Sequence, residues 1–568
     1  MSCIDGSFFC ANLQRGGGEC AIIFIYKEGK MVKKYRKLLG YIGPFRKRRF
    51  WLVVLCAASI LIGSIMPFFI GKLVNMVTVS APIADILKFG ALLIIIGLLD
   101  ATLNSTQNYI WHMYSTEYLN YFRTIMLQAA LKKNVKFFKE NDEDFTNRIL
   151  HDTSILSYDI SIGFPMLILN VLRIGIVVVL MFYMSPILTI LPLLIVPIYT
   201  FTFHRIDKKI RTASNKERQL FTRVSETVKE YLNGVLQIKI NGKEKFFLDN
   251  FKNTINEYTD SAKDIKKYTA ISYGVGGFTK ALLPIVVLIS GAILIIKGQL
   301  TLGYLFAFYS YLDFLYEPMT NLSDWYTGIN VSLGMSDRVL SFLEDDMEEE
   351  TGEKIRSIDS IEFKDVSFSY DSQKPVLNSV NFKFEKGDIV GIIGPSGSGK
   401  STIIDIILKI WDTYTGEVIV NDTELRKINR SSYYDNLSLV EQEPFIFRDT
   451  ILRNIQFDNE VVDKNVLRES ELSNLVEKKD GKLNHELTTN GANLSGGEKQ
   501  RIALARALYS DKDLIILDEF TSALDNETED KIVQNIKKLG EEGKIVIIIT
   551  HRKSPLSITN KIIDLEKF

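Results

Sequence analysis

The strongest constraint on the fold is a series of apolar stretches long enough to cross a lipid bilayer. Residues 50–70 carry no charged side chain, and a helix needs about 20 such residues to span the hydrocarbon core. The comparable stretches are residues 89–110, 160–203, 271–296 and 302–325. Because 160–203 is long enough for two helices that reverse near Ser185 and Pro186, the sequence predicts six membrane spans. A buried helix of a soluble protein explains any one stretch but not six in succession.

Positive charge alternates between the connections of these spans. Lys and Arg crowd the segment before the first span and the loop after the second, and fifteen of them lie between Arg205 and Lys267. The opposite connections are short and nearly uncharged. Since cytoplasmic loops carry the excess of Lys and Arg, we expect the N-terminus, both long loops and everything after span six to be cytoplasmic. Helical apolar spacing in residues 217–229 and 248–267 predicts that the helices continue below the membrane.

Composition excludes several other classes. The 68 Lys and Arg balance 68 Asp and Glu, which argues against a protein that coats nucleic acid, and we expect no nucleic-acid partner. Four Cys without a C-x-x-C pair, and five His in all, argue against a disulfide scaffold or a zinc module. The chemistry is therefore expected to depend on other residues.

The chain divides into four predicted regions. These are a cytoplasmic segment 1–49, a six-helix transmembrane domain 50–330, a linker 331–360 and an α/β domain 361–568. Residues 1–30 fit neither domain, and a ribosome-binding sequence can encode Lys27-Glu28-Gly29 just ahead of Met31. A mis-assigned start for residues 1–30 is therefore one of two interpretations of this segment.

A phosphate-binding loop follows the predicted strand 388–393. Its residues are Gly394, Pro395, Ser396, Gly397, Ser398, Gly399, Lys400 and Ser401, and a helix begins near Thr402. Small residues let backbone N–H groups surround phosphates at a helix N-terminus. Lys400 can reach the β- and γ-phosphates and Ser401 can bind Mg²⁺.

An acidic pair ends a second predicted strand. Asp518 and Glu519 follow four apolar β-formers, residues 514–517, which predicts a buried parallel strand. At the end of such a strand, Asp518 can hold the Mg²⁺ shell and Glu519 can orient the attacking water.

Between the loop and the acidic pair lies Leu494-Ser495-Gly496-Gly497-Glu498-Lys499-Gln500-Arg501. Ser and Gly ahead of a helix present N–H donors to an anion. In this order the segment resembles the signature sequence of the ATP-binding cassette (ABC) family.

Other motifs of that family occur in the expected order over about residues 361–568. Tyr370 is similar to the adenine-stacking aromatic, Gln442 to the Q-loop glutamine, 522–525 to the D-loop and His551 to the switch histidine. Two positions depart from the pattern: Glu498 replaces the usual Gln, and Glu441 stands where Pro is frequent. We expect Glu498 to adjust affinity or coupling without abolishing activity. With six spans ahead of it, the cassette resembles a half-transporter of the exporter type.

The resemblance implies a cofactor, a site and a partner. The cofactor is ATP with Mg²⁺, the metal being held through Ser401, Gln442 and Asp518. The signature of one cassette, Ser495 to Gly497, closes over ATP on the P-loop of another, while Glu519, Lys400 and His551 act on the γ-phosphate. One chain therefore needs a second copy or a related half-transporter. An ATP-gated channel and an importer are the rival classes.

The transported substrate stays open among peptides, lipids and amphipathic drugs. Charged residues inside spans are candidates for a pathway, namely Arg173, Lys280, Asp313 and Glu317. The alternative is that they pair with each other or lie at the water interface. By resemblance, the loop turns near 138–148 and 231–243 dock on the cassettes. We expect a multi-pass protein of a bacterial plasma membrane.

Overall fold

The computed structural model describes residues 37–38, 40–41, 43–141, 145–344, 351–370, 375–395, 397–457 and 462–567. The prediction about residues 1–30 and the site prediction for Ser396 lie outside these residues. The chain forms two compact units, one of residues 1–131 and 144–345 and the other of residues 132–143 and 346–568.

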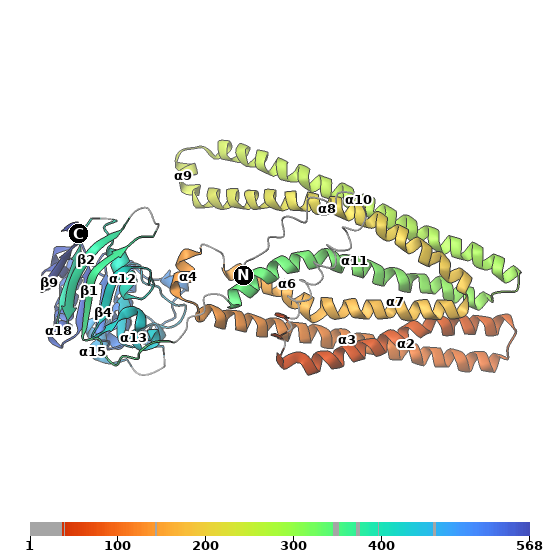
Figure 1. Ribbon diagram of the computed structural model, residues 1–568, viewed down its shortest axis with the longest axis horizontal. Helices are drawn as coiled ribbons and strands as arrows, with labels where there is room; N and C mark the ends of the chain where they lie inside the picture. The colour runs from red at the N-terminus through yellow and green to blue at the C-terminus, as the bar shows by residue number, and fades with distance from the viewer. Residues whose placement is uncertain are drawn as a thin grey trace, which may run out of the picture. The chain divides into compact units, whose positions relative to one another are not determined.

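The first unit is helical. Its long helices are α2 (Arg46–Thr78), α3 (Ile83–Leu131), α7 (Phe164–Met184), α8 (Pro186–Asn233), α10 (Glu244–Ile296) and α11 (Leu302–Glu344) (Figure 1). Short elements complete it: η1 (Gly43–Phe45), α5 (Phe145–Asn147), η2 (Arg148–Asp152), α6 (Thr153–Tyr158), η3 (Asp159–Gly163) and α9 (Val235–Ile240). Each of the six long helices contains most of one predicted span, and several extend well beyond it.

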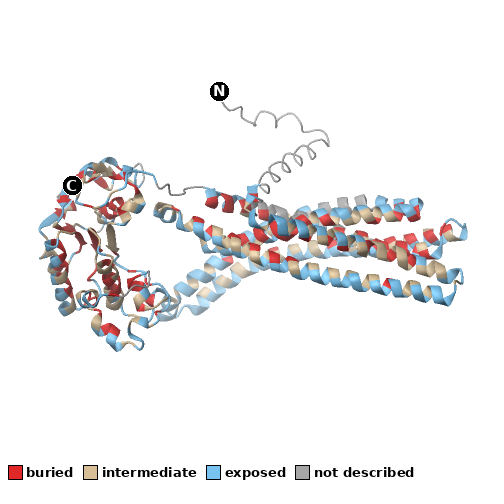
Figure 2. Cartoon of the chain, turned by 90° about the horizontal axis from the view of Figure 1, so that it is seen from below, coloured by how far each residue is buried: buried red, intermediate tan, exposed pale blue. Residues whose placement is uncertain are grey.

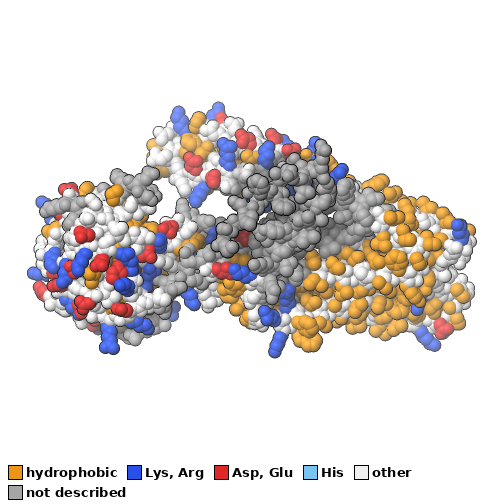
Figure 3. Space-filling view, in the orientation of Figure 1, with side chains coloured by type: hydrophobic (Ala, Val, Ile, Leu, Met, Phe, Trp, Pro, Cys, Tyr) orange, Lys and Arg blue, Asp and Glu red, His pale blue; other side chains and the backbone are white. Residues whose placement is uncertain are grey.

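Four helical stretches are long and apolar enough to cross a membrane among the residues described: Gly43–Thr78, Ile83–Leu131, Phe145–Met184 and Glu244–Ile296. The other two predicted spans lie in α8 and α11. Large apolar side chains such as Leu87, Ile94 and Leu98 of α3 are 63–67% exposed, and apolar side chains cover this part of the unit (Figure 3). Such a surface suits lipid rather than water.

The turns between spans have identifiable causes. At the α7–α8 turn, the Ser185 hydroxyl accepts a bond from the Leu188 N–H at 3.4 Å, and Pro186 occupies the first helical position. Proline suits that position because its missing N–H has no intrahelical acceptor there. The predicted reversal at Ser185 and Pro186 is therefore where one helix ends and the next begins.

Helices α2 and α11 approach each other closely at a pair of glycines. A Cβ on Gly303 would lie 2.0 Å from the carbonyl oxygen of Gly71. The Gly303 N–H donates to the side chain of Asn75 at 2.8 Å, and farther along, Tyr311 donates to the Ser64 carbonyl at 2.7 Å. Small residues allow this backbone-to-backbone contact, as is common where membrane helices pack.

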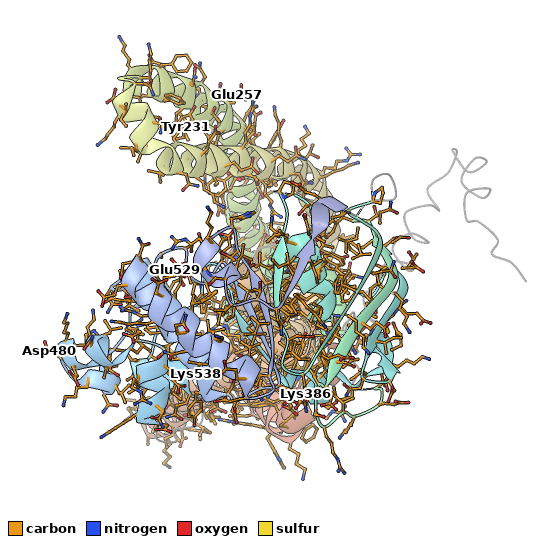
Figure 4. All side chains as sticks on the ribbon, turned by 90° about the vertical axis from the view of Figure 1, so that its left-hand side faces the viewer. Tyr231, Glu257, Lys386, Asp480, Glu529 and Lys538 are labelled. Carbon is orange, nitrogen blue, oxygen red and sulfur yellow. The ribbon has the colours of Figure 1, made fainter. Side chains whose placement is uncertain are left out.

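Helices α8 and α10 run side by side beyond the apolar region and are joined through α9 (Figures 1 and 4). Tyr231 packs edge-on against Phe247 with ring centroids 4.9 Å apart, and Arg223 pairs with Glu257 at 3.5 Å. The apolar side chains of Leu236 and Ile240 on α9 are 65% and 69% exposed.

Helix α11 continues through part of the predicted linker. It ends at Glu344, so residues 331–344 are helical. Val339 and Phe342 are buried, and Arg338 pairs with the carboxylate of Asp152 at 2.8 Å. These contacts with the preceding helical segments keep the helix intact where the sequence suggested a boundary.

The second unit contains two sheets. In the parallel sheet the order is β6-β7-β8-β3-β9, formed by β3 (Ile389–Ile393), β6 (Leu437–Val440), β7 (Leu514–Asp518), β8 (Ile545–Ile549) and β9 (Lys561–Asp564). The antiparallel sheet has the order β2-β1-β4-β5, from β1 (Ser360–Phe368), β2 (Leu377–Glu385), β4 (Thr415–Val420) and β5 (Thr423–Glu424). All five residues of β8 are buried, as expected for a strand covered on both faces.

Helices surround these sheets. The long ones are α12 (Lys400–Ile407), α17 (Gly496–Tyr509) and α18 (Asn526–Glu541). The short ones are α4 (Val135–Glu140), η4 (Leu425–Lys427), α13 (Arg430–Tyr434), α14 (Ile451–Ile455), α15 (Lys464–Glu469), α16 (Ser473–Lys478), η5 (Lys482–Asn484), η6 (Thr489–Gly491), α19 (Lys553–Leu556) and η7 (Leu565–Lys567). One apolar core joins the antiparallel sheet, α12 and the parallel sheet, and a second joins the parallel sheet to α17 and α18. Figure 2 shows buried residues in the interior of this unit. Helix α4 belongs to this unit although it lies between α3 and α5 in sequence.

Candidate nucleotide site

The predicted site residues meet at one edge of the parallel sheet. The P-loop follows β3, Gln442 follows β6, Asp518 ends β7 and His551 follows β8. These four strands are neighbours in the order β6-β7-β8-β3, and parallel strands place their carboxyl ends at the same edge. Ligands of open α/β sheets bind outside that edge.

The P-loop is shaped by glycine and closed by its lysine. Gly399 has φ +95°, which disfavours any residue with a side chain, and a Cβ there would lie 2.6 Å from Leu377. The Lys400 ammonium donates to the carbonyls of Gly394 and Pro395 at 2.6 and 2.9 Å. The hydroxyl of Ser398 is buried and has no hydrogen-bond partner among the described residues. A buried donor without a partner is costly, so this hydroxyl suits a loop that accepts an anion.

Tyr370 stands beside the first turn of α12. Its hydroxyl and that of Thr402 are 3.0 Å apart, while its side chain remains 53% exposed. The ring is therefore fixed at its polar end and open to solvent, which suits stacking on a base.

Asp518, Glu519 and Gln442 form a connected group. The Gln442 amide nitrogen donates to the Glu519 carboxylate at 2.7 Å. Glu519 has φ +42° and its N–H donates to the Ile549 carbonyl at 2.9 Å. Burial, and next the charge of Glu519, raise the pKa of Asp518. Non-glycine residues at positive φ concentrate at functional sites, and a carboxylate held away from water favours binding of a cation.

His551 follows β8 on the exposed edge of the site. The guanidinium of the next residue, Arg552, pairs with Glu529 of α18 and donates to the Ser522 carbonyl at 3.1 Å. The ion pair thereby ties the segment after β8 to α18, and the hydrogen bond to Ser522 ties it to the D-loop.

The signature segment is the N-terminus of α17 and contains a complete capping box. The Ser495 hydroxyl accepts from the Glu498 N–H at 3.3 Å, and the Glu498 carboxylate accepts from the Ser495 N–H at 2.7 Å. Lys479 lies 4.0 Å from the same carboxylate. The unusual Glu498 is thus a structural cap of the helix that presents the signature.

The signature also packs against the D-loop. A Cβ on Gly497 would lie 2.8 Å from the Ala523 carbonyl oxygen. Gln500 donates to the Ser522 hydroxyl at 2.7 Å and accepts from the Ala523 N–H at 3.1 Å. Gln500, which sequence reasoning did not select, therefore ties the two motifs together; its position in the signature was the available signal.

The predicted metal ligands have the chemistry of a magnesium site. Ser401, Gln442 and Asp518 offer hydroxyl, amide and carboxylate oxygens, the donor types that Mg²⁺ prefers, and Mg²⁺ retains several waters besides. No group of three or more His, Cys, Asp or Glu side chains with metal-binding geometry occurs in the described part of the chain. The donor set fits a metal that is shared with a bound phosphate.

Helix α4 contacts the cassette. The Lys139 ammonium lies 2.7 and 2.8 Å from the two carboxylate oxygens of Asp405 on α12. Lys136 lies 3.6 Å from Asp412 and 5.6 Å from the ring centroid of Trp411. These contacts begin at residue 136, slightly before the predicted turn at 138–148.

Within the membrane helices, the candidate charges lie in two pairs. Arg173 is 3.1 Å from Glu317, and Lys280 is 3.9 Å from Asp313. Of the two interpretations drawn from the sequence, mutual pairing is the one that these distances support.

Comparison with known proteins gives consistent results. Family models match at residues 50–319, described as the ABC transporter transmembrane region, and at residues 377–522, described as ABC transporter. An uncharacterized ABC transporter ATP-binding protein, YknV of Bacillus subtilis, is 27% identical over 96% of this chain and 92% of its own. An ATP-dependent lipid A-core flippase of Idiomarina loihiensis is 27% identical over 94% and 93% of the two chains.

Among solved structures, a bacterial Atm1-family ABC exporter with ATP bound matches with a TM-score of 0.78. It covers 92% of this chain and 93% of its own, at 21% identity. The likeness extends over both units and concerns the fold.

Proposed function

Because the chain belongs to the ABC transporters, with an exporter-type membrane region and an ATP-binding cassette fused in one polypeptide, we propose that two copies form an exporter driven by ATP hydrolysis at two shared sites. The observation that carries this proposal is the convergence of the P-loop, Gln442, Asp518, Glu519 and His551 at one sheet edge.

Hydrolysis requires a positioned water and neutralised phosphate charge. In the proposed mechanism Glu519 orients the water, and Gln442, already hydrogen-bonded to Glu519 at 2.7 Å, keeps the carboxylate aligned. Lys400 and His551 contact the γ-phosphate. Ser401, Gln442 and Asp518 would hold Mg²⁺, which supplies further neutralisation of the phosphates.

The proposed dimer follows from counting motifs. Each chain has one P-loop and one signature segment, so two chains related by a two-fold axis provide two composite sites. Ser495, Gly496 and Gly497 of one copy would close over the nucleotide of the other. A heterodimer with a related half-transporter is the alternative partner arrangement.

Two exposed apolar surfaces support this assembly. Leu236 and Ile240 on α9 are exposed, and so are Phe445, Phe447 and Phe457 on the cassette. Exposed apolar patches mark interaction sites. We propose that α9 docks against the aromatic patch of the second copy, so that cassette closure moves α8 and α10.

Closure and release would then alternate the spans between inward- and outward-open states. The proposed location is a bacterial plasma membrane with the cassette in the cytoplasm. The substrate is a peptide, lipid or amphipathic drug, and the lipid A-core flippase relative favours including lipids.

The deciding experiment is ATPase activity of the purified full chain in lipid nanodiscs, for wild type and Glu519→Gln. We expect Glu519→Gln to keep ATP binding and to lose turnover by a factor of about 10² or more. Glu527→Gln, on the exposed side of α18 in an ion pair with Lys531 at 2.7 Å, is the matched control and should keep wild-type turnover. Normal turnover by Glu519→Gln would refute the role.

A second measurement addresses the dimer and the channel alternative. In a variant without the native cysteines, Ile240→Cys with Phe445→Cys should form an intermolecular disulfide, visible as a dimer that reducing agent removes. ATP-gated conductance without directional accumulation of any lipid, peptide or drug in proteoliposomes would instead identify a channel.

A further inference from the structure

One side chain, Trp411, joins the proposed base-stacking residue to α4. Its ring meets Tyr370 edge-on, with centroids 5.4 Å apart and planes at 85°. The ammonium of Lys136 on α4 lies 5.6 Å from the centroid of the same indole. Trp411 is 9% exposed, so the indole has little freedom to move independently of these neighbours.

A second connection starts at the P-loop helix. Asp405 lies on α12, the helix that begins at Lys400. Its carboxylate accepts from Trp411 Nε1 at 3.3 Å and from Lys139 of α4 at 2.7 and 2.8 Å. Only 14% of the Asp405 side chain is exposed. Asp405 therefore links α4 to the phosphate end of the site and also to the indole at the base end.

Helix α4 is attached to the rest of the unit at its surface. None of the six residues of α4, all of them described, is buried. A cavity of about 460 Å³ opens beside it, with Lys136, Phe137 and Trp411 in its lining. The contacts described between α4 and the rest of the unit include ion pairs and a cation–π contact, and the strength of such contacts depends on geometry.

We propose that Trp411 is a positioning residue: when a nucleotide base stacks on Tyr370, Trp411 strengthens the contact between α4 and the cassette. Asp405 couples the position of α12, the helix that follows the P-loop, to the same contact. A base stacked on Tyr370 restricts the tyrosine ring, the ring restricts the indole, and the indole and Asp405 hold Lys136 and Lys139. The inference rests on the proposed function, because it takes Tyr370 as the base-binding residue.

The test is millisecond amide hydrogen exchange of residues 135–140 in the full chain, with and without ATP, in the Glu519→Gln background. We expect ATP to slow exchange in α4 by about 2- to 5-fold, the range that weak surface contacts confer. Trp411→Leu should abolish this ATP-dependent slowing. Lys136→Gln should do the same, and since Lys136 is outside the buried core, folding is not in question. Trp51→Phe, in the membrane region, is the control and should keep the full response.

A spectroscopic readout separates base sensing from phosphate binding. The chain has four tryptophans, at positions 51, 111, 325 and 411, so replacing the first three by Phe leaves Trp411 as the only indole. Saturating ATP should change the fluorescence emission of Trp411. Tyr370→Ala should remove that change even when the site is saturated, and saturation is verified by binding of radiolabelled ATP.

The outcomes distinguish the two proposals. If wild type neither binds nor hydrolyses ATP, the proposed function fails and the inference fails with it. If wild type hydrolyses ATP but Lys136→Gln keeps the full slowing in α4, or the emission change survives Tyr370→Ala, the role of Trp411 is overturned while the transporter assignment stands.

Discussion

Replacing Glu498 by Gln tests the charge at the tip of the signature helix. The carboxylate accepts from the Ser495 N–H at 2.7 Å and lies 4.0 Å from Lys479. Glutamine retains an oxygen that can accept the same bond, so the capping box survives. The substitution removes one negative charge beside the signature segment, which is proposed to close over the nucleotide of the second copy.

The magnitude follows from the helix dipole. A carboxylate at a helix N-terminus stabilises by about 0.3–1 kcal/mol, so Glu498→Gln should lower the unfolding midpoint of the cassette by about 1–4 °C. The same charge opposes an incoming phosphate. Its removal should therefore lower the KM for ATP by about 2- to 5-fold, the equivalent of that free energy. Glu498→Ala also loses the cap and should cost about 1 kcal/mol more.

The assay is steady-state ATPase kinetics in nanodiscs together with thermal unfolding. Glu527→Gln removes an exposed glutamate from another helix of the cassette and is the charge-matched control. If KM and kcat of Glu498→Gln equal those of wild type and of Glu527→Gln, the charge has no influence on nucleotide closure and the reasoning fails. A higher KM would also contradict it.

Three further predictions concern packing, pH and the D-loop. Gly303→Ala forces a Cβ against the Gly71 carbonyl and should destabilise the membrane unit by about 1–3 kcal/mol. The measurement is the melting temperature in detergent, which should fall. Gly90→Ala is the control and should keep the wild-type melting temperature, because nothing lies within 4 Å of a Cβ at that position. Burial raises the pKa of Asp518, so ionisation of its carboxyl group destabilises the fold as pH rises above the unfolded pKa. Asp518→Asn should therefore raise the melting temperature of the nucleotide-free protein above the folded pKa and leave it unchanged at low pH. An equal gain at all pH values would contradict this. Gln500→Leu removes both hydrogen bonds to the D-loop and should lower kcat by about 10-fold with ATP binding intact, measured by turnover and equilibrium binding.

The sequence identified the elements whose signals are local. Uncharged runs located the spans, and motifs such as the P-loop and the Asp518-Glu519 pair carried their own structural context. The convergence of these motifs could be anticipated because each follows a strand of one parallel sheet. Helix α11 was extended beyond its predicted end because Arg338 and Phe342 acquire partners only in the folded unit.

Contacts between distant segments were not visible in the sequence. The pairing of Lys139 with Asp405 joins residues 266 positions apart, and neither residue belongs to a motif. Trp411 belongs to no sequence motif either, because what distinguishes it is the neighbours it acquires, Tyr370 and Lys136. Such residues become apparent only when the chain is folded.

The lysine of the P-loop has a consequence for nucleotide release. Lys400 donates to the carbonyls of Gly394 and Pro395, so the loop's own backbone offers acceptors for this ammonium. On the proposed assignment, phosphate oxygens of ATP replace these backbone carbonyls as hydrogen-bond acceptors of the Lys400 ammonium. When the γ-phosphate leaves, the loop's own carbonyls can reclaim the ammonium, and the site returns to its starting state without waiting for a new ligand.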